Sequence, residues 1–169
     1  VDTLSLTLGQ GFMAIAAAQA AANGASVQEA IAAAEDVRGR THLFGALASL
    51  DYLAMGGRVN SLTAGMAGML NIKPILTIKD GKLDMLEKVR TRRKAWARTL
   101  ELVQEKAQNR PIETMNLVHT DALEQAQEFE GLLRAEVECP DEIHILPLSA
   151  GLSVHTGPGF VGVAFVTGT

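Results

Sequence analysis

Two short motifs that lie far apart in the sequence combine glycine with side chains that bind anions. Gly56-Gly57-Arg58 follows a predicted short helix, and His155-Thr156-Gly157-Pro158-Gly159 lies toward the C-terminal end. Glycine has no Cβ, so backbone N–H groups beside it can approach a ligand closely. Arginine, histidine and threonine donate hydrogen bonds that a carboxylate or phosphate accepts. The two motifs together predict an anion-binding site, and neither matches a nucleotide or metal signature.

Each of these features also has an interpretation that needs no ligand. A cation just after a helix C-terminus is favoured by the helix dipole, which alone explains Arg58. His155 before a Gly-Pro-Gly loop fits an ordinary strand connection with a hydrogen-bonded imidazole. The basic cluster from Lys88 to Lys94 is typical of a solvated face, although an acidic partner or a phosphorylated ligand would also fit it. The local sequence leaves these alternatives open.

Composition excludes several function classes. The net charge of -4 argues against a nucleic-acid partner, because a phosphate backbone requires a concentrated positive face. A single cysteine, Cys139, excludes an intrachain disulfide, and no apolar run is long enough to span a bilayer, so we expect a cytoplasmic protein. His42, His119 and His144 lack the spacing of zinc ligands, and no cofactor motif is found, so neither a metal nor a cofactor is expected.

The remaining pattern predicts a single α+β domain in which a mixed β-sheet packs against helices. Its 169 residues suffice for one hydrophobic core, and 47% of them are hydrophobic but only 4% aromatic, which predicts an aliphatic interior. Helices are predicted over 11–23, 27–38, 50–55, 61–70, 91–108 and 121–134. Strands are predicted over 42–49, 72–79, 82–90, 114–119, 143–148 and 160–166.

Local signals indicate several boundaries of these elements. Gly24 suits a left-handed residue that closes the first helix, and Ser26 with Glu29 resembles a capping box that opens the second. The dipeptide Asp80-Gly81 is typical of a two-residue hairpin turn. Pro74 cannot donate to a strand ladder, which predicts that the strand before this turn lies at an edge of the sheet.

Four motifs in this order closely resemble the DegV family, and the resemblance covers essentially the whole chain. They are the runs Leu50 to Arg58, Leu70 to Lys82 and Lys88 to Arg92, followed by His155-Thr156-Gly157-Pro158-Gly159. DegV proteins are two-domain fatty-acid-binding proteins, and some present the bound acyl chain to a fatty-acid kinase that phosphorylates its carboxylate for phospholipid synthesis. Residues 1–9 resemble the family's interdomain junction. The resemblance therefore implies that residues 1–169 are the C-terminal, acyl-chain-binding domain, with the N-terminal α/β domain absent.

By this resemblance, the domain supplies the tunnel for the acyl tail and part of the carboxylate site. The tunnel lining is expected from apolar residues: Phe44, Leu53, Met66, Met69, Leu70, Ile75 and Phe165. His155, Thr156 and the backbone around Gly157 are expected to bind the carboxylate, because a buried charge without partners is costly. Three arginines are expected near the ligand mouth or on the surface used with the kinase: Arg58, Arg90 and Arg92. No catalytic base is expected, and the ligand is a long-chain fatty acid.

Two other function classes stay open at this point. One is a small-molecule enzyme in which His155 acts as general acid or base in a glycine-rich loop. The other is a structural or interaction domain, in which the apolar helix 61–70 meets a partner helix or the absent N-terminal domain. Apolar surface left exposed by a missing domain would also favour a homodimer.

Overall fold

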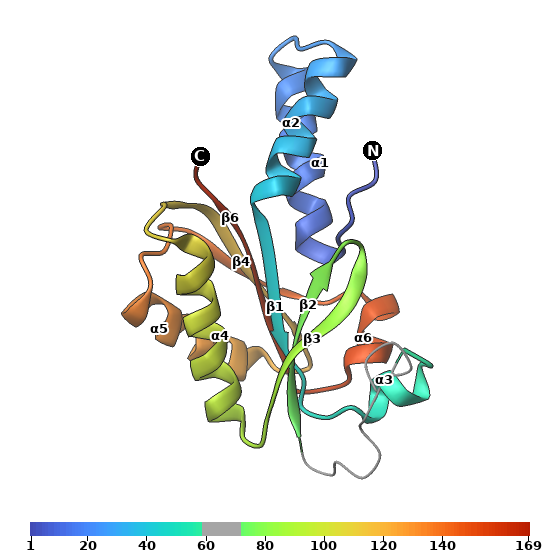
Figure 1. The fold of residues 1–169 in the computed structure, drawn as a ribbon, viewed down its shortest axis with the longest axis vertical. Coiled ribbons are helices and arrows are strands. Elements are labelled where there is room, and N and C mark those ends of the chain that lie inside the picture. Colours follow the sequence, from blue (N-terminus) through green and yellow to red (C-terminus); the bar gives the residue numbers. More distant parts are fainter. Residues whose placement is uncertain (59–71) are drawn as a thin grey trace.

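The described part of the chain forms one mixed sheet. The computed structural model describes residues 1–58 and 72–169, and within them the strand order is β3-β2-β1-β6-β4-β5 (Figure 1). The strands are β1 (Thr41–Ala46), β2 (Lys73–Lys79), β3 (Lys82–Val89), β4 (Ile112–Thr120), β5 (Ile143–Pro147) and β6 (Phe160–Thr167). Neighbouring strands pair antiparallel except β4 and β5, which run parallel. The predicted α+β class with a mixed sheet is confirmed.

Helices cover both sides of this sheet. They are α1 (Thr7–Ala22), α2 (Val27–Arg40), α3 (Asp51–Met55), α4 (Arg92–Ala107), α5 (Leu123–Glu136) and α6 (Ala150–Thr156). The helices α4 and α5 pack on one face, whereas α3 and α6 lie on the other side, and the α1–α2 hairpin extends beyond the end of the strands (Figure 1). The helix expected over 61–70 lies outside the described residues.

The predicted boundary signals form the expected local structures. Gly24, with φ of 85°, follows the end of α1 in the left-handed region. The Ser26 side chain accepts a hydrogen bond from Glu29 N at 3.3 Å, and Glu29 Oε2 accepts one from Ser26 N at 2.7 Å, which confirms the capping box. Asp80 and Gly81 have φ of 51° and 73°, as a tight hairpin turn requires. The hairpin of β2 and β3 is therefore confirmed.

The position of Pro74 differs from the prediction. Strand β2 lies between β1 and β3 rather than at an edge. Pro74 pairs with Lys88 of β3, whereas the paired residues of β1 and β2 end at Ala46 and Ile75, so the proline lies just beyond them. The Pro74 carbonyl still accepts a hydrogen bond from Leu47 N at 3.0 Å. In an antiparallel pair the N–H and C=O of one residue point toward the same neighbouring strand, so the missing N–H of Pro74 falls at the end of the β1–β2 ladder.

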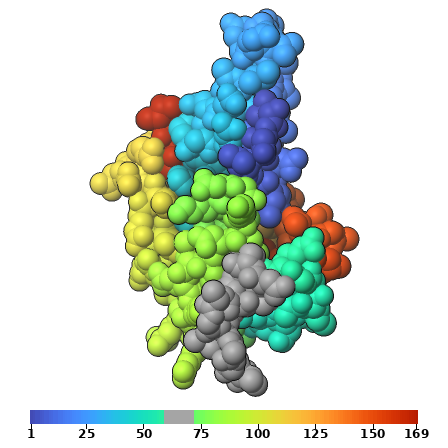
Figure 2. All heavy atoms as spheres, turned by 45° about the vertical axis from the view of Figure 1, so that its right-hand side comes forward, coloured from blue at the N-terminus to red at the C-terminus, as the bar shows by residue number. Residues whose placement is uncertain are grey.

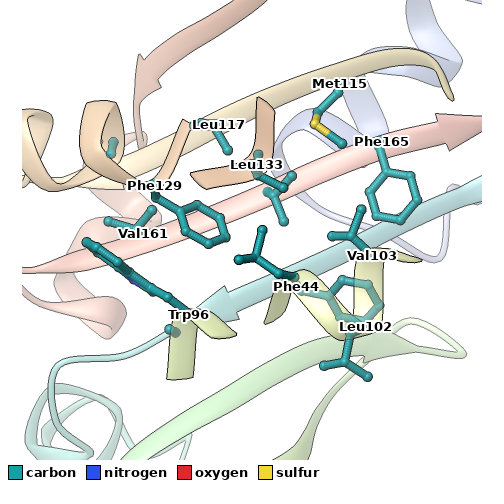
Figure 3. Close-up of a cluster of buried hydrophobic side chains, with 14 of the residues drawn as sticks. Phe44, Trp96, Leu102, Val103, Met115, Leu117, Phe129, Leu133, Val161 and Phe165 are labelled. Carbon is teal, nitrogen blue, oxygen red and sulfur yellow. The ribbon is translucent and has the colours of Figure 1, made fainter. Parts of the chain in front are cut away.

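The largest buried cluster lies between the sheet and the helices α4 and α5 (Figure 3). Trp96 of α4 and Phe129 of α5 meet at a tilt of 42° with ring centroids 5.5 Å apart. Phe44 and Phe165 meet from neighbouring strands at 6.2 Å. The rest of the cluster is mainly aliphatic. Each fully buried large side chain contributes roughly 1.5–3 kcal/mol by leaving water, so this face holds most of the core stability.

His42, at the margin of this cluster, gives the fold a pH dependence. Its ring centroid lies 5.2 Å from that of Phe165, and its Nε2 is buried with no hydrogen-bond partner among the described residues. Burial, together with the positive charges of Lys106 and Arg110, lowers the pKa of His42 to about 4. The unfolded chain takes up a proton near the ordinary histidine pKa of about 6.5, and the folded chain does not. Stability therefore falls as the pH drops from about 6.5 to about 4.

We expect this acid loss of stability to be on the order of 1–2 kcal/mol, because solvent screens a ring that is only partly buried. Replacing the ring by a side chain that does not titrate, as in His42→Leu, should remove this part of the pH dependence. Thermal unfolding of both proteins across the same pH window measures it. Parallel curves for the two proteins would contradict the assignment.

Candidate functional site

A cavity of about 360 Å³ lies on the sheet face opposite α4 and α5. Its floor is one row of paired residues across the central strands: Val118 of β4, Gly162 of β6, Gly45 of β1 and Leu76 of β2. Residues of α3, α6, the β2–β3 hairpin and the N-terminal segment form its walls. A volume of this size is typical of a small-molecule site.

The two paired glycines of the floor make room for an aromatic wall. A Cβ on Gly45 would lie 2.5 Å from Phe160 Cε2, and a Cβ on Gly162 would lie 2.9 Å from Phe160 Cζ. The phenyl ring therefore lies directly against the backbone of β1 and β6, where any larger residue would displace it. Because Phe160 also lines the cavity, its ring is an apolar surface close to the sheet.

Helix α3 ends in a Schellman motif that places Arg58 at the cavity. Gly57 has φ of 68°, its N–H donates to Ala54 O at 3.0 Å, and the Arg58 N–H donates to Leu53 O at 2.9 Å. The guanidinium turns back, and its Nη1 donates to Gly56 O at 3.0 Å. Arg58 is exposed and lines the cavity, and its predicted place just after a helix C-terminus is confirmed.

The segments α3 and α6 pack through glycines from both predicted motifs. A Cβ on Gly56 would lie 2.8 Å from His155 Cε1, and a Cβ on Gly157 would lie 2.6 Å from Tyr52 Cε2. An aromatic ring of the other segment thus packs directly against each glycine. A side chain at either position would prevent this close contact. The structure brings the two motifs together on one side of the cavity, and Figure 2 shows the two helices side by side.

His155 and Thr156 give this side of the cavity its polar groups. The His155 Nδ1 is buried without a hydrogen-bond partner within residues 1–58 and 72–169, and the residue lines the cavity. The Thr156 hydroxyl lies 2.9 Å from the Thr120 hydroxyl, which holds α6 against the end of β4. Arg58 adds a positive charge. A cavity that is apolar along its floor and cationic at one end suits an amphiphilic anion.

The C-terminal motif lies in a short helix rather than only in a loop. His155 and Thr156 occupy the last turn of α6, a helix that the sequence analysis did not predict. The residue before it, Ser149, makes no side-chain capping bond. The sequence also lacks a capping box here, because the third helical residue is Leu152 instead of glutamate or glutamine. The helical conformation nevertheless places both side chains on the cavity wall.

The backbone around Gly157 has a different role from the one expected for it. Gly157 N–H donates to Ser153 O and Gly159 N–H donates to Thr120 O, each at 2.9 Å. The proline between them has no N–H. These groups therefore hold α6 and the following turn in place, and they are not left as donors for a carboxylate. Gly157 is the C-cap of α6 and is not part of the cavity lining.

The residues expected along the tunnel separate into distinct groups. Leu53 lines the cavity. The strand residues lie instead in the core beneath α4 and α5, each at most 2% exposed: Phe44, Ile75 and Phe165. Successive residues of a strand point to opposite faces, so Gly45 and Leu76 face the cavity and their neighbours cannot. The last group lies outside the described residues: Met66, Met69 and Leu70.

Two arginines expected on a partner-facing surface lie near the start of α4. Arg90 is exposed between β3 and α4. The Arg92 guanidinium lies 4.9 Å from the centroid of the Trp96 ring and 3.7 Å from a Glu128 carboxylate oxygen, an exposed pair that contributes at most about 1 kcal/mol. Arg92 lines a separate hollow of about 290 Å³ together with Lys73. The structure therefore does not place Arg92 in the cavity that Arg58 lines.

Sequence reasoning missed most of the cavity lining. Leu83 of β3, Val118 of β4 and Leu152 of α6 line it, and so do the two floor glycines. Glycine inside a strand is a signal that another group approaches the backbone closely. Gly45 and Gly162 fall inside the predicted strands 42–49 and 160–166, so this signal could have located the floor.

Two further properties concern residues 1–58 and 72–169, namely metal binding and the capacity to cross a membrane. In this part of the chain, no group of three or more histidine, cysteine, aspartate and glutamate side chains is arranged to hold a metal ion. None of the helices described above combines the length and the apolar character needed to cross a membrane.

Known proteins match this chain in both sequence and fold. The model of the DegV family, described as "Uncharacterised protein, DegV family", matches residues 1–168. A DegV domain-containing protein of Streptomyces coelicolor is 36% identical over 163 residues, which are 96% of this chain and 58% of that protein. A crystal structure of a DegV family protein from Corynebacterium glutamicum has a TM-score of 0.90 at 32% identity, covering 100% of this chain and 64% of that one.

A second solved structure that is similar to this chain is described by its ligand. The structure "Fatty Acid Binding of a DegV family Protein from Thermus thermophilus" has a TM-score of 0.88 at 27% identity, covering 99% of this chain and 60% of that one. The chain thus spans less than two thirds of the length of these relatives. Because the family match extends over nearly all of its residues, the chain belongs to the DegV family.

Proposed function

We propose that this chain binds a long-chain fatty acid, with the acyl tail in the cavity and the carboxylate beside His155 and Arg58. The observation that carries the proposal is the combination of an apolar floor with a cationic end in one cavity. The Thermus thermophilus relative is described as binding fatty acid, and it shares its fold with 99% of this chain. A fatty acid has the matching arrangement, with an apolar body and one anionic end.

The apolar lining supplies most of the affinity in this proposal. Each buried methylene contributes about 0.8 kcal/mol, before the cost of ordering the acyl chain is subtracted. Leu76, Leu83 and Val118 offer the aliphatic surface that such a tail needs. Longer acyl chains should therefore bind more tightly until the cavity is filled.

The polar end offsets the cost of taking a carboxylate out of water. That cost is several kcal/mol unless the charge is paired and hydrogen-bonded. The Arg58 guanidinium offers both charge and donors, and the His155 imidazole can donate a hydrogen bond whether it is neutral or protonated. Since Arg58 is exposed, its charge also attracts an anion from solution toward the cavity.

The proposal extends to the part of the relatives that this chain does not match. We propose that an N-terminal α/β domain of the family's kind adds serine and threonine donors to the carboxylate site. A fatty-acid kinase would then approach the exposed arginines: Arg58, Arg90 and Arg92. We assign no catalytic residue to the chain itself, because in this proposal the kinase phosphorylates the carboxylate.

A matched pair of substitutions on β3 tests the binding site. Leu83 is half-buried and lines the cavity, whereas Leu86 on the same strand is 38% exposed and is not part of the lining. We expect Leu83→Asp to weaken the binding of hexadecanoic acid at least about thirtyfold, because an ionised carboxylate must then be desolvated beside the tail. Leu86→Asp should change the affinity by no more than about twofold. Isothermal titration calorimetry of the three proteins gives the comparison.

Native mass spectrometry, followed by organic extraction, first establishes whether purified wild-type chain carries lipid. Circular dichroism confirms that both variants keep the wild-type fold. Equal weakening by Leu83→Asp and Leu86→Asp would overturn the placement of the tail in this cavity. A wild-type chain that neither carries lipid nor binds added hexadecanoic acid would overturn the proposed function.

A further inference from the structure

A second cavity lies directly beyond the first along the same sheet face. It measures about 200 Å³, and its lining includes Gly9, Met13 and Thr41. The two cavities share Leu43 of β1 and Ile78 of β2 as lining residues. These two side chains therefore stand between the spaces and contact both.

The pairing register places Leu43 and Ile78 next to each other, one row beyond the floor of the first cavity. Gly45 pairs with Gly162 on one side and with Leu76 on the other, and the Phe160 ring lies over the two glycines. One row along, Leu43 pairs with Ala164 of β6. Phe44 pairs with Thr77, so the next two residues in this antiparallel register, Leu43 and Ile78, lie beside each other. A row with two branched aliphatic side chains thus follows the glycine row.

The N-terminal segment lines both cavities. Leu6 and Thr7 line the first cavity, whereas Leu4 and Ser5 line the second. A Cβ on Gly81 would lie 3.2 Å from Leu4 Cδ2, so the segment is seated against the tip of the hairpin. Figure 2 shows it, in dark blue, beside the green hairpin. The row of Leu43 and Ile78 and this segment therefore lie where the two spaces meet.

We propose that Leu43 and Ile78 form the partition that limits the length of the acyl chain in the site. This inference rests on the proposed function, with the carboxylate at the His155 end and the tail running toward the partition. Each methylene that is buried improves affinity about fourfold. The gain stops where the tail reaches the two side chains. Trimming the partition would open the second cavity, whose far end carries the polar residues Arg38 and Asp80 and therefore admits only a short extension of the tail.

The length profile of binding tests the partition. Dissociation constants for the saturated series from dodecanoic to eicosanoic acid are measured for wild-type chain and for Leu43→Ala. In the wild type, the affinity gain per added methylene should stop within the series. In Leu43→Ala it should continue for about two further methylenes, so that affinity for the longer acid relative to the shorter rises about fifteenfold.

Leu117→Ala is the matched control, because Leu117 is fully buried on the opposite face of the same sheet. It removes the same atoms and should leave the length at which the gain stops unchanged. Ile78→Ala is the second variant if Leu43→Ala does not fold, and Ile78→Phe should move the limit toward shorter acids.

The outcomes separate this inference from the function on which it rests. Wild-type chain that binds no member of the series overturns the proposed function. Wild-type chain that binds the acids, together with a length limit unmoved in Leu43→Ala and in Ile78→Ala, overturns only the partition. A limit moved equally by Leu117→Ala would also overturn it, because loosening of the whole sheet would then explain the change.

Discussion

Gly157→Ala is expected to lower the free energy of unfolding by about 3–5 kcal/mol. Gly157 has φ of 69° and ψ of 172°, a backbone conformation that is essentially reserved for glycine. An added Cβ would also lie 2.6 Å from Tyr52 Cε2, so the ring of α3 must move. Backbone strain and steric overlap act on the same methyl group, which makes this substitution more severe than an ordinary glycine replacement.

The same methyl group should separate the two halves of the polar site. Tyr52 joins α3 to the end of α6, and its displacement would move His155 away from Arg58. Fatty-acid binding by the folded fraction should therefore weaken as well. Urea unfolding gives the stability change, and titration with hexadecanoic acid gives the binding change.

Gly151→Ala is the matched control for this substitution. Gly151 lies in α6 as well, and a Cβ there would meet nothing within 4 Å. Alanine at a helical position is favoured over glycine by roughly 0.5–1 kcal/mol, so this variant should be as stable as the wild type or slightly more stable. If the two alanine variants had equal stabilities, the described contact between Gly157 and Tyr52 would be wrong.

Phe165→Ala is expected to cost about 3–5 kcal/mol of stability while leaving fatty-acid affinity close to that of the wild type. Phe165 is fully buried beneath α4 and α5, where it contacts the rings of His42 and Phe44. Its removal leaves a space in the core that the surrounding side chains fill only in part. The cavity that we propose for the tail is on the opposite sheet face and keeps its lining.

Urea unfolding measures the stability loss of Phe165→Ala. Titration with hexadecanoic acid, under conditions where the variant is folded, measures its affinity. The titration must report on folded protein. A circular dichroism spectrum close to that of the wild type at the titration temperature establishes this. A folded Phe165→Ala protein that has lost its fatty-acid affinity would contradict the structure. It would support instead the sequence-based expectation that Phe165 lines the tunnel.

The features that sequence alone could predict depend on residues close together in the chain. The hairpin turn at Asp80 and Gly81 requires positive φ, which Asp-Gly supplies locally. The capping box of Ser26 and Glu29 is complete within one helical turn. Arg58 follows a helix end that its own neighbours specify. These features were predictable because no distant partner is needed to form them.

The lining of the cavity depends on distant pairing and could not be predicted in this way. Every residue of β6 is buried, so the strand shows no alternation of polar and apolar residues that would assign Phe165 to one face. Gly45 acquires its place in the floor only by pairing with Gly162. Pro74 likewise occupies a strand with neighbours on both sides because the pairing with β1 ends at Ile75, and this depends on the partner strand.

The pairing of β1 with β6 has a kinetic consequence. Thr41 pairs with Val166, so the centre of the sheet joins segments that are far apart in the sequence. Contacts with such large sequence separation slow folding, because the entropy of closing the intervening loop is lost before the contacts form. The β2–β3 hairpin and the helices can form early from local contacts. The floor at Gly45 and Gly162 forms only when β6 enters between β1 and β4, so we expect the cavity to be one of the last parts of the molecule to assemble.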